Sequence, residues 1–161
     1  MPLGMWGLVV RVLIFDILAS FTVAMMEIQI EGASGWAKHL PTHKFHNWLT
    51  RMIWGSQGIT GYHLWLASTV LVFIHLPFFV FPKLWSPSLE AFTLASFLFA
   101  VVLEDFFWFI LNPAFRLKKF NKQNVTWFDH WFGPVPLFYI RLLLVAMLLF
   151  WIFVTFNTQT F

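Results

Sequence analysis

Four long apolar stretches, separated by more polar segments, dominate the pattern of this chain. They run from about residue 5 to 28, 62 to 80, 89 to 111 and 136 to 156. Each is close to the roughly 20 residues that an α-helix needs to cross the hydrocarbon core of a bilayer. Because backbone polar groups inside a bilayer must bond within their own segment, we expect each stretch to be a helix. The pattern predicts an all-α integral membrane protein, a four-transmembrane-helix up-down bundle whose single transmembrane domain covers residues 1–161.

The segments that connect these stretches differ in length and in charge. Residues 82–88 form a short turn, so the second and third helices should make an antiparallel hairpin. The longer segments 29–61 and 112–135 should then lie together at the opposite end of the bundle, which we call the loop face. Most basic residues fall in these two segments: Lys38, Lys44, Arg51, Arg116, Lys118, Lys119 and Lys122. Since positive charge is enriched in cytoplasmic loops, we expect the loop face to be cytoplasmic and both termini to lie outside the cytoplasm.

Two surface elements are expected in the loop face. Apolar residues recur there at the spacing of one helix face, at Phe45, Trp48, Leu49, Met52 and Ile53. This spacing predicts an interfacial amphipathic helix over about 43–54, with Thr42 as its N-cap. Aromatic residues in the second long segment predict a short interfacial turn over about 126–132.

Composition narrows the class of protein further. The chain is 60% hydrophobic and only 11% charged, which is too few charges for the surface of a soluble domain of this length. It has no Cys, which excludes thiolate metal sites and a Cys nucleophile. The sequence carries no nucleic-acid-binding module, so the expected partners are membrane lipids and other membrane subunits.

Small and polar residues form a stripe on each of two predicted helices. In the first stretch they recur at helical spacing at Asp16, Ser20, Ala24, Glu27 and Glu31. In the third stretch the same pattern comprises Thr93, Ser96, Ala100 and Glu104. Small residues allow close helix contact in membranes, and a charged side chain in a bilayer is costly unless it faces the interior of the bundle. Both stripes are therefore expected to face inward.

Six ionisable residues are expected to gather at the loop face: Glu27, Glu31, His63, Glu104, Asp105 and His130. Imidazole and carboxylate ligands together suit Zn, Fe or Mn, and carboxylate-rich helical bundles hold dimetal centres. We therefore predict a divalent-metal site with Glu104, His63 and His130 as the catalytic groups. Arg141 offers an alternative, because its predicted depth nearly equals that of Glu104. An ion pair between Arg141 and Glu104 or Asp105 would account for these charges without a metal.

His75 stands apart as the candidate cofactor-binding residue. It lies within the second apolar stretch, two residues before Pro77. A haem or chlorophyll could take it as a single axial ligand, since no other His is expected at its depth. The alternative is a hydrogen bond between its ring and a backbone carbonyl, such as the one that Pro77 leaves without an N–H partner.

Three functions are open on these grounds. The first is a small membrane enzyme that uses a divalent metal on a lipid or lipophilic substrate at the loop face. The second is a non-catalytic accessory or assembly subunit of a larger membrane complex, associated with a pigment or a haem. The third is a proton or ion pathway along Asp16, His75 and Glu104. Stoichiometric metal would favour the first, stable partners or a chromophore the second, and flux through liposomes the third.

Overall fold

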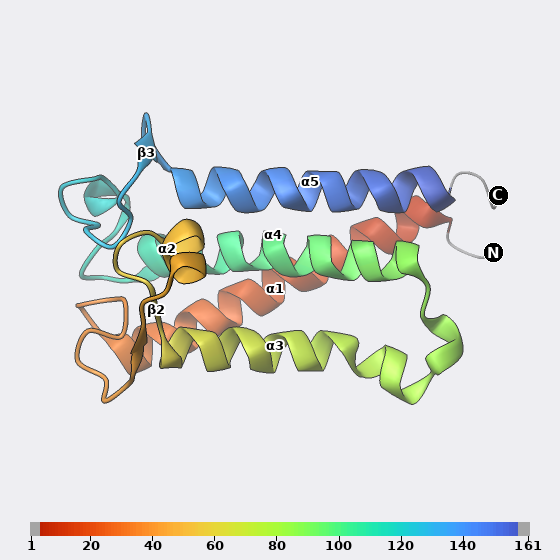
Figure 1. Cartoon of the computed structure of the whole chain (residues 1–161), viewed down its shortest axis with the longest axis horizontal. Coiled ribbons are helices and arrows are strands. Elements are labelled where there is room, and N and C mark those ends of the chain that lie inside the picture. The colour runs from red at the N-terminus through yellow and green to blue at the C-terminus, as the bar shows by residue number, and fades with distance from the viewer. Residues whose placement is uncertain (1–3, 158–161) are drawn as a thin grey trace.

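Four long helices form most of the protein in a computed structural model that describes residues 4–157 (Figure 1). They are α1 (Met5–Glu31), α3 (Gly61–Val80), α4 (Pro87–Leu111) and α5 (Leu137–Asn157). Each is long and apolar enough to cross a membrane. Their ends lie within three residues of the predicted stretches. The chain is thus a mostly helical protein with four candidate membrane-spanning helices.

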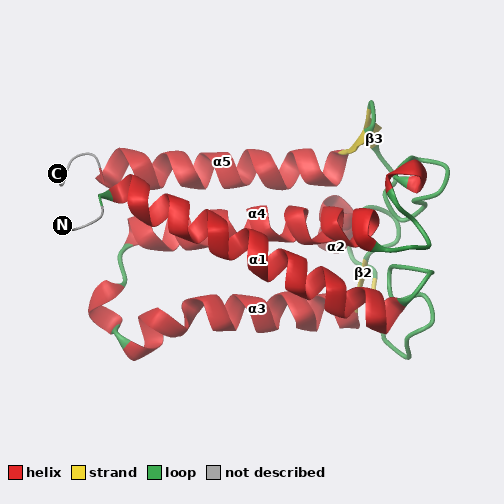
Figure 2. Cartoon of the chain, turned by 180° about the vertical axis from the view of Figure 1, so that it is seen from behind, coloured by secondary structure: helices red, strands yellow, loops and turns green. Residues whose placement is uncertain are grey.

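The four helices lie along one another and alternate in direction (Figure 1). The short connection between α3 and α4, which contains the 3-10 turn Pro82–Leu84, lies at the end where α1 begins and α5 ends. Helix α4 packs closely along both α1 and α5, whereas α3 touches its neighbours at few places. Seen from behind, α1 crosses α4 obliquely, starting beside α5 and finishing beside the start of α3 (Figure 2). This tilt brings the last turn of α1 against the first turn of α3.

Polar caps determine where two of these helices begin. The Thr60 side chain accepts the backbone N–H of His63 at 3.3 Å, which starts α3 and sets the direction of its first turn. The Ser86 side chain accepts the N–H of Leu89 at 3.2 Å, and Pro87 occupies the first turn of α4, where its missing N–H costs nothing.

The predicted interfacial helix is shorter than expected. Helix α2 covers only Trp48–Trp54, and Lys44–Phe45 instead forms strand β1, which pairs antiparallel with β2 (Ile59–Thr60). The prediction over 43–54 is therefore wrong in its first turn. Phe45 fits the apolar spacing of a helix, but its backbone is taken up by pairing with a segment that lies beyond α2.

The N-cap of α2 is Asn47, and not Thr42 as the sequence suggested. The Asn47 side chain accepts the N–H of Thr50 at 2.8 Å, and the Thr50 hydroxyl accepts the N–H of Asn47 at 2.9 Å. This reciprocal capping box satisfies two N–H groups at once, so the helix starts there. Thr42 accepts the N–H of Tyr62 at 2.9 Å and so ties the loop to the start of α3.

The stretch 126–132, which we predicted to be a short turn at the membrane surface, has two parts. Its first part carries buried aromatic side chains, and its last two residues form one strand of a hairpin. Strand β3 (Trp131–Phe132) pairs antiparallel with β4 (Val135–Pro136). Trp127 and Phe128, which we expected at the membrane surface, are buried with exposed fractions of 8% and 5%. They belong to the aromatic core that holds the loop face against α4 and α5.

This aromatic core surrounds Phe109, whose side chain is completely buried. The Phe109 ring stacks on Trp127 at 5.8 Å between centroids and meets the edges of Phe115 and Phe120. A smaller core at the other end of the bundle comprises Val9, Phe92 and Phe153. The loop face is therefore fixed to the helices by close aromatic contacts.

The polar stripe of α1 faces α4, as predicted from the small residues. The Ser96 hydroxyl donates to both carboxylate oxygens of the buried Asp16, at 2.8 and 2.9 Å. One turn further along α1, the Ser20 hydroxyl donates to the carbonyl of Ala100 at 2.9 Å. These bonds join the two helices in their apolar middle, where water cannot replace them.

Ser96→Ala should lower the free energy of unfolding by about 1–2 kcal/mol, because it leaves the buried Asp16 carboxyl without its donor. Unfolding in mixed micelles with increasing dodecyl sulfate, followed by circular dichroism, measures this loss. Ser68→Ala is the matched control, since the Ser68 hydroxyl bonds only the carbonyl of Leu64 in its own helix. Equal effects of the two substitutions would contradict a specific role for the Asp16–Ser96 contact.

Candidate functional site

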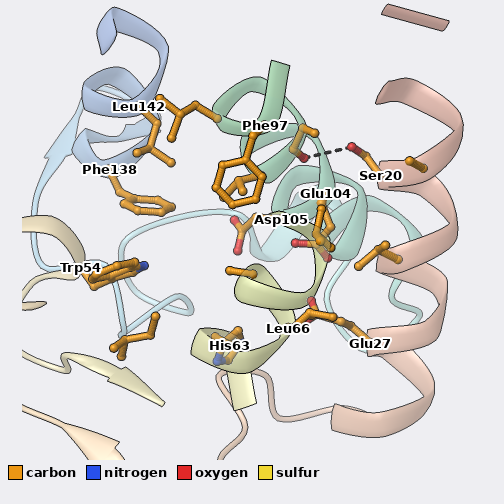
Figure 3. Close-up of a pocket in the computed structure, with 18 of the residues that line it drawn as sticks. Ser20, Glu27, Trp54, His63, Leu66, Phe97, Glu104, Asp105, Phe138 and Leu142 are labelled. Carbon is orange, nitrogen blue, oxygen red and sulfur yellow. Dashed lines mark hydrogen bonds between the residues drawn. The ribbon is translucent and has the colours of Figure 1, made fainter. Parts of the chain in front are cut away.

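A cavity of about 190 Å³ lies between α1, α3, α4 and α5 (Figure 3). Most of its wall is apolar and includes Ala67, Val70, Phe97, Val101 and Leu142. Trp36, Trp54 and Ile59 from the loop-face segments also line it, so the cavity lies in the half of the bundle nearer that face. Carboxyl and imidazole groups gather at this end.

Five of the six residues that the sequence placed in one cluster lie together here. They are Glu27 and Glu31 on α1, His63 on α3, and Glu104 and Asp105 on α4. We call the four carboxyl residues the acidic cluster. Figure 3 shows Glu27, Glu104 and His63 projecting from three different helices toward one another, with Asp105 beside them. The oblique path of α1 accounts for this meeting, because it carries Glu27 and Glu31 to the first turn of α3.

The His63 ring is held on three sides. Its Nε2 lies 3.3 Å from the Glu31 carboxylate, and its Nδ1 lies 2.6 Å from the Thr60 hydroxyl. The Trp36 ring stacks on it with 4.5 Å between centroids. Glu31 is itself positioned by the backbone N–H of Ala37, which donates to it at 2.5 Å. His63 and Glu31 therefore form an oriented imidazole–carboxylate pair.

Asp105 is positioned from the opposite side of the cavity. The Tyr139 hydroxyl on α5 donates a hydrogen bond to its carboxylate. Tyr139 is buried, with an exposed fraction of 5%, so this bond links α4 to α5 inside the bundle.

Glu27 and Glu104 differ from the rest of the acidic cluster. Their carboxyl groups lie within interaction distance of each other. Each has one buried oxygen, Oε1, without a hydrogen-bond partner among the described residues. The buried Tyr62 hydroxyl lies close enough to the Glu27 carboxyl to interact with it, but makes no well-aligned hydrogen bond within the described part of the chain. Buried polar atoms normally have partners, so this group marks a place where a proton or a bound group would be stabilised.

Arg141 does not pair with Glu104 or Asp105. Its side chain is exposed, and Nη1 donates to the carbonyl of Met52 in α2 at 2.8 Å. Residues two positions apart on a helix differ by about 200° of rotation. Tyr139 therefore faces α4, while Arg141 faces away from it. The alternative in which Arg141 neutralises Glu104 or Asp105 is therefore wrong.

His130 lies outside the cluster. It is exposed and lines a small separate pocket together with Asp129 and Arg141. The Asp129 carboxylate accepts hydrogen bonds from the hydroxyl and the backbone N–H of Ser56, which ties this segment to the end of α2. Within residues 4–157, no three His, Asp or Glu side chains are arranged to hold a metal ion.

His75 lies near the α3–α4 turn, away from this cavity. Its Nδ1 is 2.7 Å from the carbonyl of Leu71, and its Nε2 is 2.9 Å from the Glu90 carboxylate, which also accepts the Trp85 indole N–H at 3.0 Å. The bonded carbonyl is not the one that Pro77 frees. In this arrangement neither ring nitrogen is left for a haem or a chlorophyll, and the three residues of the proposed relay, Asp16, His75 and Glu104, are not brought together.

The sequence interpretation did not include Glu90, although the signal was present. His75 lies five residues before the end of α3, and Glu90 lies three residues after the start of α4, so both are within about a turn and a half of the short α3–α4 connection. Antiparallel helices joined by a short turn place such residues opposite each other. The predicted hairpin could therefore have located the partner of His75.

The chain matches no protein-family model, no curated protein and no solved structure. The function must therefore be argued from what the site can do chemically. A carboxyl pair and an oriented imidazole can donate and accept protons within one small volume. The apolar wall beside them can hold a hydrocarbon group.

Proposed function

We propose that this chain is a multi-pass membrane enzyme that binds a lipophilic substrate in the cavity and performs general acid–base chemistry on its polar end. The observation that carries this proposal is that Glu27 and Glu104 lie together, buried, at the end of an apolar cavity. Each has one oxygen without a hydrogen-bond partner among the described residues. Intramembrane carboxylates are costly and are usually retained for function. A concave apolar pocket with a few convergent polar groups is the usual form of a small-molecule site.

The residues of the cluster take distinct roles in this proposal. Glu104 and Glu27 exchange a proton with the substrate, because among the carboxyl residues of the acidic cluster these two combine burial with an oxygen that has no hydrogen-bond partner in the described chain. His63, oriented by Glu31, is a second acid–base group on the other side of the polar end. Asp105 is fixed by Tyr139 and stabilises positive charge that develops on the substrate. Residues of these types suit Zn, Fe or Mn, although no three of the described His, Asp or Glu side chains are arranged to hold an ion. Elemental analysis of the purified protein tests whether such an ion takes part.

The proposed membrane orientation follows from the loop face. Its Lys and Arg residues favour the cytoplasmic side, which leaves both termini outside. Helix α2 then lies in the membrane interface, with Trp48 and Met52 exposed by 77% and 57% toward the lipid. The cavity borders this interface through Trp54 of α2, where a lipid-soluble substrate and water-borne protons are both available.

Glu104→Gln should abolish the reaction while leaving the fold intact, because it keeps the size of the side chain and removes its proton exchange. General acid–base groups contribute roughly 10²–10⁴-fold to a rate. Mass spectrometry of total lipid extracts from cells that carry either form measures the outcome. A lipophilic compound should accumulate in the variant, and its product should be depleted.

Glu90→Gln is the matched control for this test. It removes a carboxylate of the same length from the same helix, but at the end remote from the cavity, where Glu90 bonds His75. Its lipid extract should equal that of the unaltered protein. Identical extracts from all three strains would overturn the proposed function.

A further inference from the structure

The charge around the cavity is unbalanced. Glu27, Glu104 and Asp105 line it, and none of the described lining residues is Lys or Arg. The only basic group in the wall is His63, and its Nε2 already faces Glu31, a further carboxylate. Such a site favours a ligand that brings positive charge, because a cation would relieve both the burial cost and the mutual repulsion of the carboxylates.

Glu27 supplies a second and independent sign of a ligand. Its side chain is only 4% exposed and borders the cavity, and its Oε1 has no hydrogen-bond partner among the described residues. On the facing helix, Oε1 of Glu104 is also buried and also has no hydrogen-bond partner among the described residues. The two carboxyl groups and the Tyr62 hydroxyl lie within interaction distance of one another, so an N–H donor that entered between Glu27 and Glu104 could bond both residues.

The remaining walls suit an organic cation. Trp54, Phe97 and Phe138 also line the cavity, on the side of Asp105 (Figure 3). Aromatic faces attract ammonium groups and also pack against hydrocarbon. Beyond them the wall is aliphatic, with Leu66 and Val70 on α3 among its residues. The cavity therefore has negative charge at one end and apolar surface beyond it, which matches an amphiphile with a cationic head and a hydrocarbon tail.

The volume of the cavity limits what it holds. An apolar cavity of about 150 Å³ accommodates benzene, so about 190 Å³ holds a head group and a few methylene groups. The rest of a longer chain must leave the bundle. Its route passes along α3, which is the least closely packed of the four helices and faces the lipid on its other side.

We infer that the substrate of the proposed reaction is a lipophilic cation, whose ammonium head lies between Glu27 and Glu104 and whose alkyl chain runs along α3. This inference rests on the proposed function and names the substrate class for the same site. It differs from that proposal in a testable way, since acid–base chemistry alone requires no charge on the ligand.

Binding of hexylammonium, hexan-1-ol and hexanoate to the full chain in phosphatidylcholine nanodiscs tests the inference. Isothermal titration calorimetry, corrected with empty nanodiscs, gives the three affinities. Hexylammonium should bind at least tenfold more tightly than hexan-1-ol, and hexanoate should bind least. In Glu27→Gln and in the Glu27→Gln/Glu104→Gln double variant, hexylammonium should approach the affinity of hexan-1-ol. Glu90→Gln should retain the full preference.

A second pair of variants locates the binding. Ala67→Phe fills the cavity wall and should remove binding of hexylammonium and hexan-1-ol alike. Val72→Phe, on the outer face of the same helix with 65% exposure, should leave both unchanged. Binding that survives Ala67→Phe would place the ligand elsewhere and overturn the inference.

The outcomes separate this inference from the proposed function. Equal affinities of the unaltered protein for hexylammonium and hexan-1-ol would overturn the cationic substrate, while a neutral lipophilic substrate for the same enzyme would stand. Failure of all three ligands to bind would overturn the inference together with the substrate cavity itself. Hexylammonium binding that the Glu27 and Glu104 variants do not weaken would overturn the assigned head-group site.

Discussion

Phe109→Ala should lower the free energy of unfolding by about 3–5 kcal/mol, the largest loss expected from removing a single side chain of this protein. Phe109 is completely buried, and its ring contacts Trp127, Phe115 and Phe120 from three directions. All three neighbours come from the loop segment between α4 and α5, which packs over the end of α4. They cannot all move inward when the ring is removed, so a cavity remains and its cost adds to the lost burial.

Phe73→Ala is the matched control for this prediction. Phe73 lies on the outer face of α3 with an exposed fraction of 67% and makes none of the contacts that define the aromatic core. Its removal should change the free energy of unfolding by less than about 1 kcal/mol. Unfolding in mixed micelles with increasing dodecyl sulfate, followed by tryptophan fluorescence and circular dichroism, measures both. Similar losses for the two variants would show that the aromatic core does not hold the loop face.

Phe109→Ala should also affect the cavity that contains the acidic cluster. Glu104 lies five residues earlier on α4, or about 8 Å along the helix axis. The aromatic core packs the loop face over this end of α4, and the loop segment that follows α1 carries Trp36 onto His63. Loosening the core in Phe109→Ala should therefore also weaken ligand binding in the cavity, whereas Phe73→Ala should not.

The four long helices could be predicted closely because one physical demand determines them. A segment in hydrocarbon must satisfy its own backbone and expose apolar side chains, so the length of the apolar run sets the length of the helix. Even α1, which carries Asp16 and Glu27, remains continuous, because these residues are buried and Asp16 faces α4. The interior stripe could be predicted on the same grounds.

The loop face could not be predicted as well, since partners distant in the sequence determine it. Phe45 and Trp48 share an apolar spacing, yet one lies in a strand and the other in a helix. The difference arises from the capping box at Asn47 and from pairing with Ile59, and neither changes the hydrophobic pattern. Trp127 is buried for a similar reason: the aromatic core takes it in as one of many rings.

Depth along the helices predicted most of the cluster, and rotation accounts for what was missed. The rise of 1.5 Å per residue placed Glu27 and His63 near the loop face and Glu104 roughly 10 Å below it. The structure brings all three to one cavity. Depth along the helix also placed Arg141 nearly level with Glu104, but at this depth the inward-facing residue of α5 is Tyr139, which bonds Asp105. Which face of a helix points inward depends on packing of the whole bundle, and an apolar helix such as α5 gives little sign of it in its sequence.

Gly58→Ala should be nearly as damaging as Phe109→Ala, through the backbone and not through lost burial. Gly58 has φ +64°, and a Cβ there would lie 2.3 Å from the carbonyl oxygen of Phe45 and 2.9 Å from the ring of His46. A backbone carbonyl in a paired strand cannot move aside as a side-chain end can. Left-handed strain and this collision together should cost about 3 kcal/mol or more.

Gly32→Ala isolates the collision from the strain. Gly32 also has φ +64°, but nothing lies within 4 Å of a Cβ at that position. Its ψ of −132° places it in the mirror image of the β region, which is open to Gly and strained for other residues, so its replacement should cost about 1–3 kcal/mol from the backbone alone. The difference between the two losses, measured by the same unfolding assay, is then the cost of separating β1 from β2. Because β2 ends in Thr60, which caps α3 and bonds His63, Gly58→Ala should also disturb the imidazole of the site. Equal losses for the two glycines would mean that the strand pairing between Phe45 and Ile59 contributes nothing to the stability of the loop face.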